Sequence, residues 1–195
     1  MKGRALGWRG TGLAVMALAL TGCSGPAPKT YDLSAPLSGI AGRQSRGQLV
    51  VTEPVATQAL DAERILIRPK RDEVAYLSGA QWADRLPKLV QTRLIQTFEN
   101  ARLLAHVGRP GERLSADLTL DSEIRSFEID VERGEAVVEI SVKLVNDRSG
   151  RIVSGQIFRA HVAGSAASGE GASAALDAAL AQVMRAIVQW ASGRI

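Results

Sequence analysis

Residues 114–164, LSADLTLDSEIRSFEIDVERGEAVVEISVKLVNDRSGRIVSGQIFRAHVAG, contain three long runs in which apolar and polar residues alternate. Two short polar segments, ERGE and NDRSG, separate the runs. Alternation with a period of two is typical of strands that bury one face, and short polar turns between such strands favour an antiparallel meander. We therefore predict a sheet of long antiparallel strands with one apolar and one wet face, and this sheet decides the fold.

The alternation changes phase once within the first run. Before the change the apolar positions are Leu114, Ala116, Leu118, Leu120 and Ile124, and after it they are Phe127, Ile129 and Val131. A one-residue slip in a clean alternation is what a β-bulge produces, so we predict a bulge near Ser126. The core positions of the second run are Ala136, Val138, Ile140, Val142 and Leu144.

Two other segments have the three- and four-residue spacing of amphipathic helices. The first apolar stripe consists of Trp82, Leu86, Leu89, Val90, Leu94 and Phe98. The second consists of Ala172, Leu176, Ala179, Leu180, Val183, Ile187 and Trp190. We expect Asp84 to cap the first helix, Pro87 to lie in its first turn and Asn100 to lie near its end. Ser168 or Ser173 is expected to cap the second helix.

Shorter apolar runs complete the predicted sheet. LVVTEPV from Leu49, RILIRP from Arg64, EVAYL ending at Ser78-Gly79 and ARLLAHV at 101–107 each predict a strand, and Tyr31–Leu33 predicts a brief edge strand. Apolar helix stripes and an apolar sheet face bury each other in a two-layer sandwich. The predicted fold class is α+β, a two-layer sandwich in which two amphipathic helices pack on one face of a mostly antiparallel sheet. The other face is polar, and is solvated or used for a partner.

The first 22 residues have the organisation of a secretory leader. Lys2, Arg4 and Arg9 precede an apolar run, Gly12 to Leu20, that is too short to span a membrane. The segment LTGC that follows resembles the bacterial lipobox, whereas the alternative is a buried cysteine at the end of a core helix. We expect cleavage between Gly22 and Cys23 and acylation of Cys23 by chains such as palmitate. Ser24, in place of the Asp that retains lipoproteins in the inner membrane, favours the periplasmic face of the outer membrane.

Removal of the leader changes the charge of the chain. The whole sequence carries a formal charge of +4, and the loss of three leader cations brings the mature chain to about +1. Its charges are interleaved and only 4% of its residues are aromatic, which argues against a nucleic-acid surface. We predict a signal peptide at 1–22, a lipidated cysteine with a flexible tether and N-terminal segment at 23–48, and a single α+β domain at 49–195.

The sequence predicts no enzyme, cofactor or metal site. It contains no G-x-S-x-G and no G-x-x-x-x-G-K-[ST] motif. His106 and His161 lie in strand-like runs without triad or zinc-ligand spacing, which is typical of structural or exposed histidines. The acidic residues that alternate along one strand, as on a wet sheet face, are Asp121, Glu123, Glu128 and Asp130. A glycosidase pair among them is the one enzymatic interpretation that remains open.

The order of these features resembles the ABC-type transport auxiliary lipoprotein family. The likeness runs roughly from Tyr31 to Trp190 and includes the early YDL, EVAYLSGAQWADRLPKLVQTRLIQTFE, the meander and the closing helix behind a lipobox. Its most characteristic part is Tyr76 at a strand end, six residues before the pair Trp82-Ala83 that opens a helix. The resemblance implies a docking subunit for an MCE-type periplasmic protein with its ABC permease and ATPase, in lipid transport between two membranes.

Two questions about partners stay open at this point. A structural envelope lipoprotein, of the secretin-pilot or cell-wall-synthase-activator type, is the alternative function, and a homo-oligomer is compatible with either. We predict that the surface from Tyr76 to Trp82 contributes to a partner or self-association contact. The competing prediction is that both aromatic residues fill the core between helix and sheet.

Overall fold

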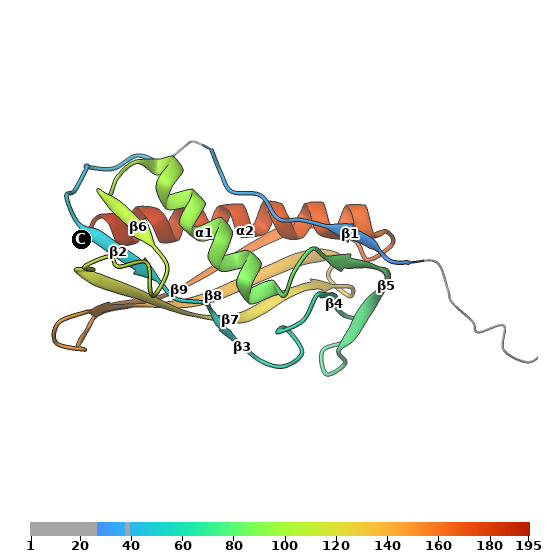
Figure 1. Ribbon diagram of the computed structural model, residues 1–195. Helices are drawn as coiled ribbons and strands as arrows, with labels where there is room; N and C mark the ends of the chain where they lie inside the picture. Colours follow the sequence, from blue (N-terminus) through green and yellow to red (C-terminus); the bar gives the residue numbers. More distant parts are fainter. Residues whose placement is uncertain (1–26, 38–39) are drawn as a thin grey trace, which may run out of the picture.

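The computed structural model describes residues 27–37 and 40–195 of the chain. Its strands are β1 (Lys29–Tyr31), β2 (Gln48–Val51), β3 (Val55–Ala56), β4 (Arg64–Arg68), β5 (Ala75–Trp82), β6 (His106–Gly108), β7 (Leu118–Asp130), β8 (Glu135–Asn146) and β9 (Ile152–Ala163). Its helices are α1 (Leu86–Ala101) and α2 (Gly169–Ser192). Both helices lie on the same side of one sheet, which confirms the predicted α+β sandwich (Figure 1).

The predicted meander is formed by β7, β8 and β9, which pair antiparallel along nearly their whole lengths. The register of β7 against β8 shifts between Ile124 and Ser126, which leaves Arg125 as the extra residue of a β-bulge and confirms the predicted position. The bulge brings Phe127 and Ile129 to the buried face, where both are at most 1% exposed. Val131 does not follow them: it lies beyond the end of β7 and is 44% exposed, so its predicted core position is wrong.

The other edge of β7 pairs with three short strands in succession. β2, β3 and β4 lie parallel to β7 at Leu118–Leu120, Glu123–Ile124 and Glu128–Asp130. The sheet is therefore mixed, although its long pairings are antiparallel. Local alternation carries no signal for the direction of a distant partner strand, so these parallel pairings were not predicted.

Strand β5 is longer than predicted. It passes through Ser78 and Gly79 and ends at Trp82, whose backbone N–H donates to the carbonyl of Glu63 at 2.6 Å. Gly79 has φ of +70°, and the register against β4 shifts over this stretch. A positive φ lets the strand bulge and resume, because glycine has no Cβ to clash. Trp82 therefore closes a strand and does not open the helix.

Helix α1 begins at Leu86, with Pro87 in its first turn as predicted. The predicted cap is wrong, because Arg85 occupies the N-cap position and offers no side-chain cap. The Asp84 carboxylate instead accepts from the Arg85 backbone N–H and pairs with Lys88 Nζ at 2.9 Å. The hydrogen bond from Lys88 is the main reason that the pKa of Asp84 lies below its usual value. The helix ends at Ala101. The strand predicted over 101–107 is shorter in the structure, where it is β6 at His106–Gly108.

Helix α2 is capped by Ser168, whose Oγ accepts from the backbone N–H of Gly171 at 3.1 Å. Ser173 instead donates to the carbonyl of Glu170. Every residue of the predicted apolar stripe is buried. By length and composition α2 is the one helix of the described residues that qualifies as a membrane span, yet it packs over β8 and β9 as a core helix.

Candidate docking surfaces

Cys23, which is expected to carry the lipid, and Gly22, which precedes the expected cleavage site, lie outside the described residues. The described chain begins at Ala27 and enters β1 at Lys29, which pairs parallel with β5. The edge strand predicted at Tyr31–Leu33 is thus found two residues earlier. Whatever precedes Lys29 reaches the domain through this strand.

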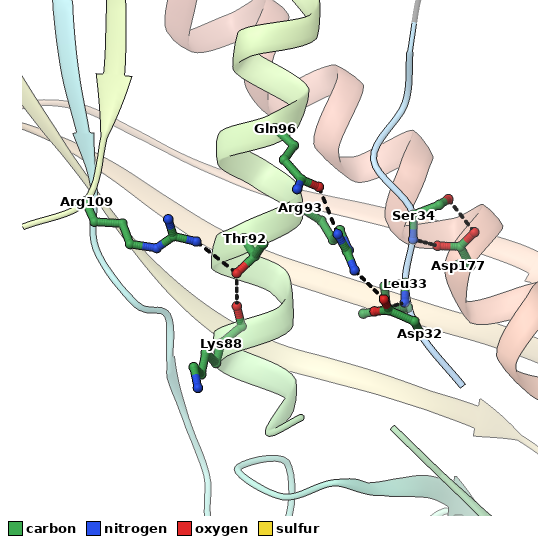
Figure 2. Close-up of polar contacts among 9 residues, drawn as sticks. All are labelled: Asp32, Leu33, Ser34, Lys88, Thr92, Arg93, Gln96, Arg109 and Asp177. Carbon is green, nitrogen blue, oxygen red and sulfur yellow. Dashed lines mark hydrogen bonds and ion pairs between the residues drawn. The ribbon is translucent and has the colours of Figure 1, made fainter. Parts of the chain in front are cut away.

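We refer to residues 29–37 as the N-terminal strap. It consists of β1 and the segment that follows β1 along both helices (Figure 1). The Asp32 carboxylate accepts from the Arg93 guanidinium of α1 at 2.5 Å. Ser34 donates twice to the Asp177 carboxylate of α2, from its N–H at 2.7 Å and from its hydroxyl at 2.6 Å. Figure 2 shows these side chains reaching the strap from the two helices.

Further contacts extend the strap at both ends. The carbonyl of Tyr31 accepts from the backbone N–H of Ala83 at 2.8 Å, and the carbonyl of Pro36 accepts from Asn100 Nδ2 at 3.1 Å. Between them Leu33 is 3% exposed and belongs to the hydrophobic core. Force on the N-terminal end of the strap is therefore passed to α1, α2 and β5 together.

The residues predicted to form a partner contact differ in exposure. Trp82 is 1% exposed and packs edge-on against Phe127 with 5.8 Å between ring centroids, so its side chain fills the core. Tyr76 is half-buried on the side of the sheet opposite to the Trp82 side chain. There the Arg64 guanidinium lies 3.6 Å from the centroid of the Tyr76 ring. Only Tyr76 of the pair has a face that a partner can reach, and a contact there remains a proposal.

The helix-free face of the sheet carries cross-strand ion pairs. Arg68 of β4 forms a two-pronged pair with Glu128 of β7, at 2.7 and 3.0 Å, and Arg159 pairs with Glu139. The hydrogen bonds that Arg68 donates to the Glu128 carboxylate are the main reason that the pKa of Arg68 is raised. Glu128, expected to be wet, is only 7% exposed because Arg68 covers it. Two carboxylates of this face, Glu128 and Glu139, are thus each paired with an arginine.

The histidines lie on strands far apart in the sheet. His161 of β9 faces Glu135, with 3.1 Å between Nδ1 and the carboxylate, whereas His106 of β6 lines an open hollow with Glu99 and Arg102. Among residues 27–37 and 40–195, no group of three or more His, Cys, Asp or Glu side chains is placed to hold a metal ion. His161 therefore lies beside a single carboxylate, and His106 lies apart from it.

One surface was missed by the sequence analysis. Five chain segments meet at the end of the domain that holds the C-terminal residues, namely 42–47, 102–105, 109–117, 147–151 and 193–195. We call them the arginine end, because together they contain eight arginines, three carboxylates and no lysine. Charge patterning along the chain did not reveal it, because no segment contributes more than two of these arginines.

Comparison with known proteins identifies relatives of the whole domain. The family described as ABC-type transport auxiliary lipoprotein component matches residues 31–188. An uncharacterised protein of Bradyrhizobium diazoefficiens is 34% identical over 174 residues, which are 88% of this chain and 47% of that protein. The chain therefore spans about half the length of this curated relative.

Solved structures share the same fold. A protein of Xanthomonas campestris, described as a DUF330 family representative, is 28% identical with a TM-score of 0.73, covering 86% of this chain and 95% of the other. A second uncharacterised protein is 15% identical with a TM-score of 0.68, covering 85% and 99% of the two chains. The second likeness concerns the fold alone.

Proposed function

The chain belongs to the family of ABC-type transport auxiliary lipoprotein components, and from this we propose that it is an outer-membrane-anchored periplasmic subunit of an MCE-type lipid transport system. In this role it has no catalytic function and helps to maintain the integrity of the envelope. Its partners are the MCE-type periplasmic protein and, through it, the ABC permease and ATPase.

The N-terminal strap is the observation that carries this proposal. An anchor at Cys23 would lie six residues before Lys29, within about 20 Å of it for a fully extended chain. The strap then fastens the following segment to both helices through Asp32 and Ser34. A subunit held by its lipid and pulled by a partner needs such a fixed connection between anchor and domain.

The anchor itself is proposed from the leader sequence. Cleavage between Gly22 and Cys23 followed by acylation leaves the domain on the membrane surface, because several acyl chains together anchor a protein stably. Ser24 supports export to the outer membrane. The absence of a phosphate-loop motif from the sequence supports a role in which a partner hydrolyses ATP.

Replacement of the anchoring cysteine tests the proposal. Cys23→Ala should leave the domain folded but shift it from the outer-membrane fraction, and should make cells sensitive to lipophilic agents. Cys23→Ala should also lose its co-purification with the MCE-type protein from detergent-solubilised envelopes. A Ser24→Ala variant, which keeps the cysteine, is the matched control and should behave as the unaltered protein.

Two results would contradict the proposal. Fractionation of Cys23→Ala with the outer membrane would contradict the proposal that a lipid on Cys23 anchors the protein. Co-purification of the unaltered chain with a secretin or with cell-wall synthases, in place of a transport protein, would favour the structural lipoprotein function.

A further inference from the structure

We propose that the arginine end is the docking site for an acidic, extended segment of a periplasmic protein partner. Its identification with a component of the transport system rests on the proposed function, whereas the binding chemistry does not. The five segments that form it carry an excess of five positive charges. The loops at the opposite end of the domain, 69–74, 131–134 and 164–168, carry three cations and three carboxylates and are balanced.

Most arginines at this end have no carboxylate partner, whereas six of the nine described arginines elsewhere in the domain have one. Within the described residues, the ion pair of Arg109 with Glu112 at 3.9 Å is the only one formed by the eight. Arginines that each pair with a carboxylate elsewhere are Arg68, Arg85, Arg93, Arg125, Arg133 and Arg159. Guanidinium groups left without carboxylates are free to bind those of another molecule, two oxygens at a time.

The arginines also surround hollows that a chain segment can enter. Arg148 and Arg194 line an open hollow of about 430 Å³ with Leu118, Val153 and Ile195, and Ile195 also borders a second hollow with Arg43. A third hollow, of about 320 Å³, contains Arg102 with Leu104 and Val107. The segments that line these hollows are neighbours, because the N–H of Ser45 donates to the carbonyl of Leu103 at 2.8 Å and its hydroxyl to that of Ile195 at 2.9 Å.

The backbone at this end is strained beneath two of the arginines. Arg102 and Arg113, with φ of 54° and 52°, are the only described residues other than glycine with positive φ. This region costs a residue with a Cβ about 1 kcal/mol, and glycine would relieve the cost. Arg102 ends α1 in this conformation, and residues held in it against the preference for glycine cluster at functional sites.

An acidic protein segment fits this surface better than the anchoring membrane does. The strap enters the domain beside Gly169, the first residue of α2, whereas the arginine end lies beyond Ser192, the last (Figure 1). The 24 residues of α2 separate the two ends by about 36 Å. β9 also begins at the arginine end as an edge strand, with Ile152 and Val153 61% and 53% exposed, which suits an extended segment carrying apolar side chains.

Binding to the full chain in detergent tests this inference. The probes are a fluorescent peptide that alternates glutamate with leucine, the same peptide with glutamine for each glutamate, and vesicles of phosphatidylglycerol. The test variant combines Arg102→Gly, Arg113→Gly and Arg148→Ser. The control variant combines Lys70→Ser, Arg71→Ser and Arg133→Ser at the opposite end and removes the same number of charges.

The acidic peptide should bind the unaltered chain with an affinity that falls as salt is added, and the glutamine peptide should bind much less. The test variant should bind the acidic peptide at least about tenfold more weakly, without a lower unfolding temperature, because its two glycines relieve strain. The control variant should bind like the unaltered chain. Equal weakening in both variants, no weakening in either, or binding to the vesicles alone would overturn the inference.

The outcomes also separate this inference from the proposed transport role. If the test variant loses the peptide while the unaltered chain fails to co-purify with an MCE-type protein, the docking site stands and the transport role falls. If co-purification succeeds and is unaffected by the test variant, the docking site is elsewhere on the domain.

Discussion

The attachment of the strap depends on a small number of side chains, and Asp177 accepts two of its hydrogen bonds. Its carboxylate accepts two hydrogen bonds from Ser34, across 143 residues of sequence. Arg93 holds Asp32 from the neighbouring helix, and Leu33 is buried between these two contacts. The polar bonds set the path of the strap, and the burial of Leu33 supplies the apolar contribution.

Substitution of Asp177 tests this arrangement. Asp177→Ala should lower the free energy of unfolding by about 1 kcal/mol, because two charge-assisted hydrogen bonds at a partly exposed site are lost. The Ser34 amide should exchange its hydrogen faster while amides of β8 keep their protection. Gln182→Ala, an exposed change on the same helix, is the control. Unchanged exchange at Ser34 would show that the strap is held by other contacts.

The strain at Arg102 leads to an opposite prediction. Arg102→Gly should raise the free energy of unfolding by about 0.5 kcal/mol. Arg102 follows the last residue of α1 with φ of 54°, and glycine adopts this φ without the steric cost of a Cβ. Arg148→Gly, at a residue without positive φ, should give no increase. Chemical denaturation of both variants checks this, and destabilisation by Arg102→Gly would mean that its side chain contributes to the fold.

The strands and helices differ in how far the sequence predicts them. The long alternation of β7, β8 and β9 and the stripe of α2 predicted these elements and a bulge near Ser126, which the structure has at Arg125, since pattern and burial agree over many residues. Asp84 and Trp82 were misassigned because cap and strand end depend on a bulge at Gly79 that the local pattern does not reveal. The arginine end was missed because it is assembled from five separate segments.

The bulge of β7 provides a test at this level. Deletion of Arg125 removes the extra residue, so Ile124 and Ser126 follow each other opposite Ile140 and Glu139, and Phe127 and Ile129 keep facing the core in an unbroken alternation. The deleted protein should therefore still unfold cooperatively, as followed by circular dichroism on heating. Arg125→Ala should lose less than about 1 kcal/mol, because its pair with Glu123 is largely exposed. Loss of the cooperative transition in the deletion variant would contradict the assignment of Arg125 as the unpaired residue.

The molecule as a whole has two ends with different properties. The strap enters at one end beside the start of α2, and the arginine-rich loops and the C-terminal residues lie at the other (Figure 1). The rigid sheet and α2 connect them, because their buried faces form one hydrophobic core. This polarity suits a subunit that is fixed to a membrane by one end and offers the other to a periplasmic partner.

The anchor and the transport role both depend on the chemical state of Cys23. Intact-protein mass spectrometry of the chain purified from its own envelope measures that state. We predict a polypeptide that begins at Cys23, with a diacylglyceryl group on the sulfur and a fatty acyl chain on the new amino terminus. A chain that keeps residues 1–22, or that begins at Cys23 with an unmodified thiol, would contradict the anchor and the transport role proposed from it.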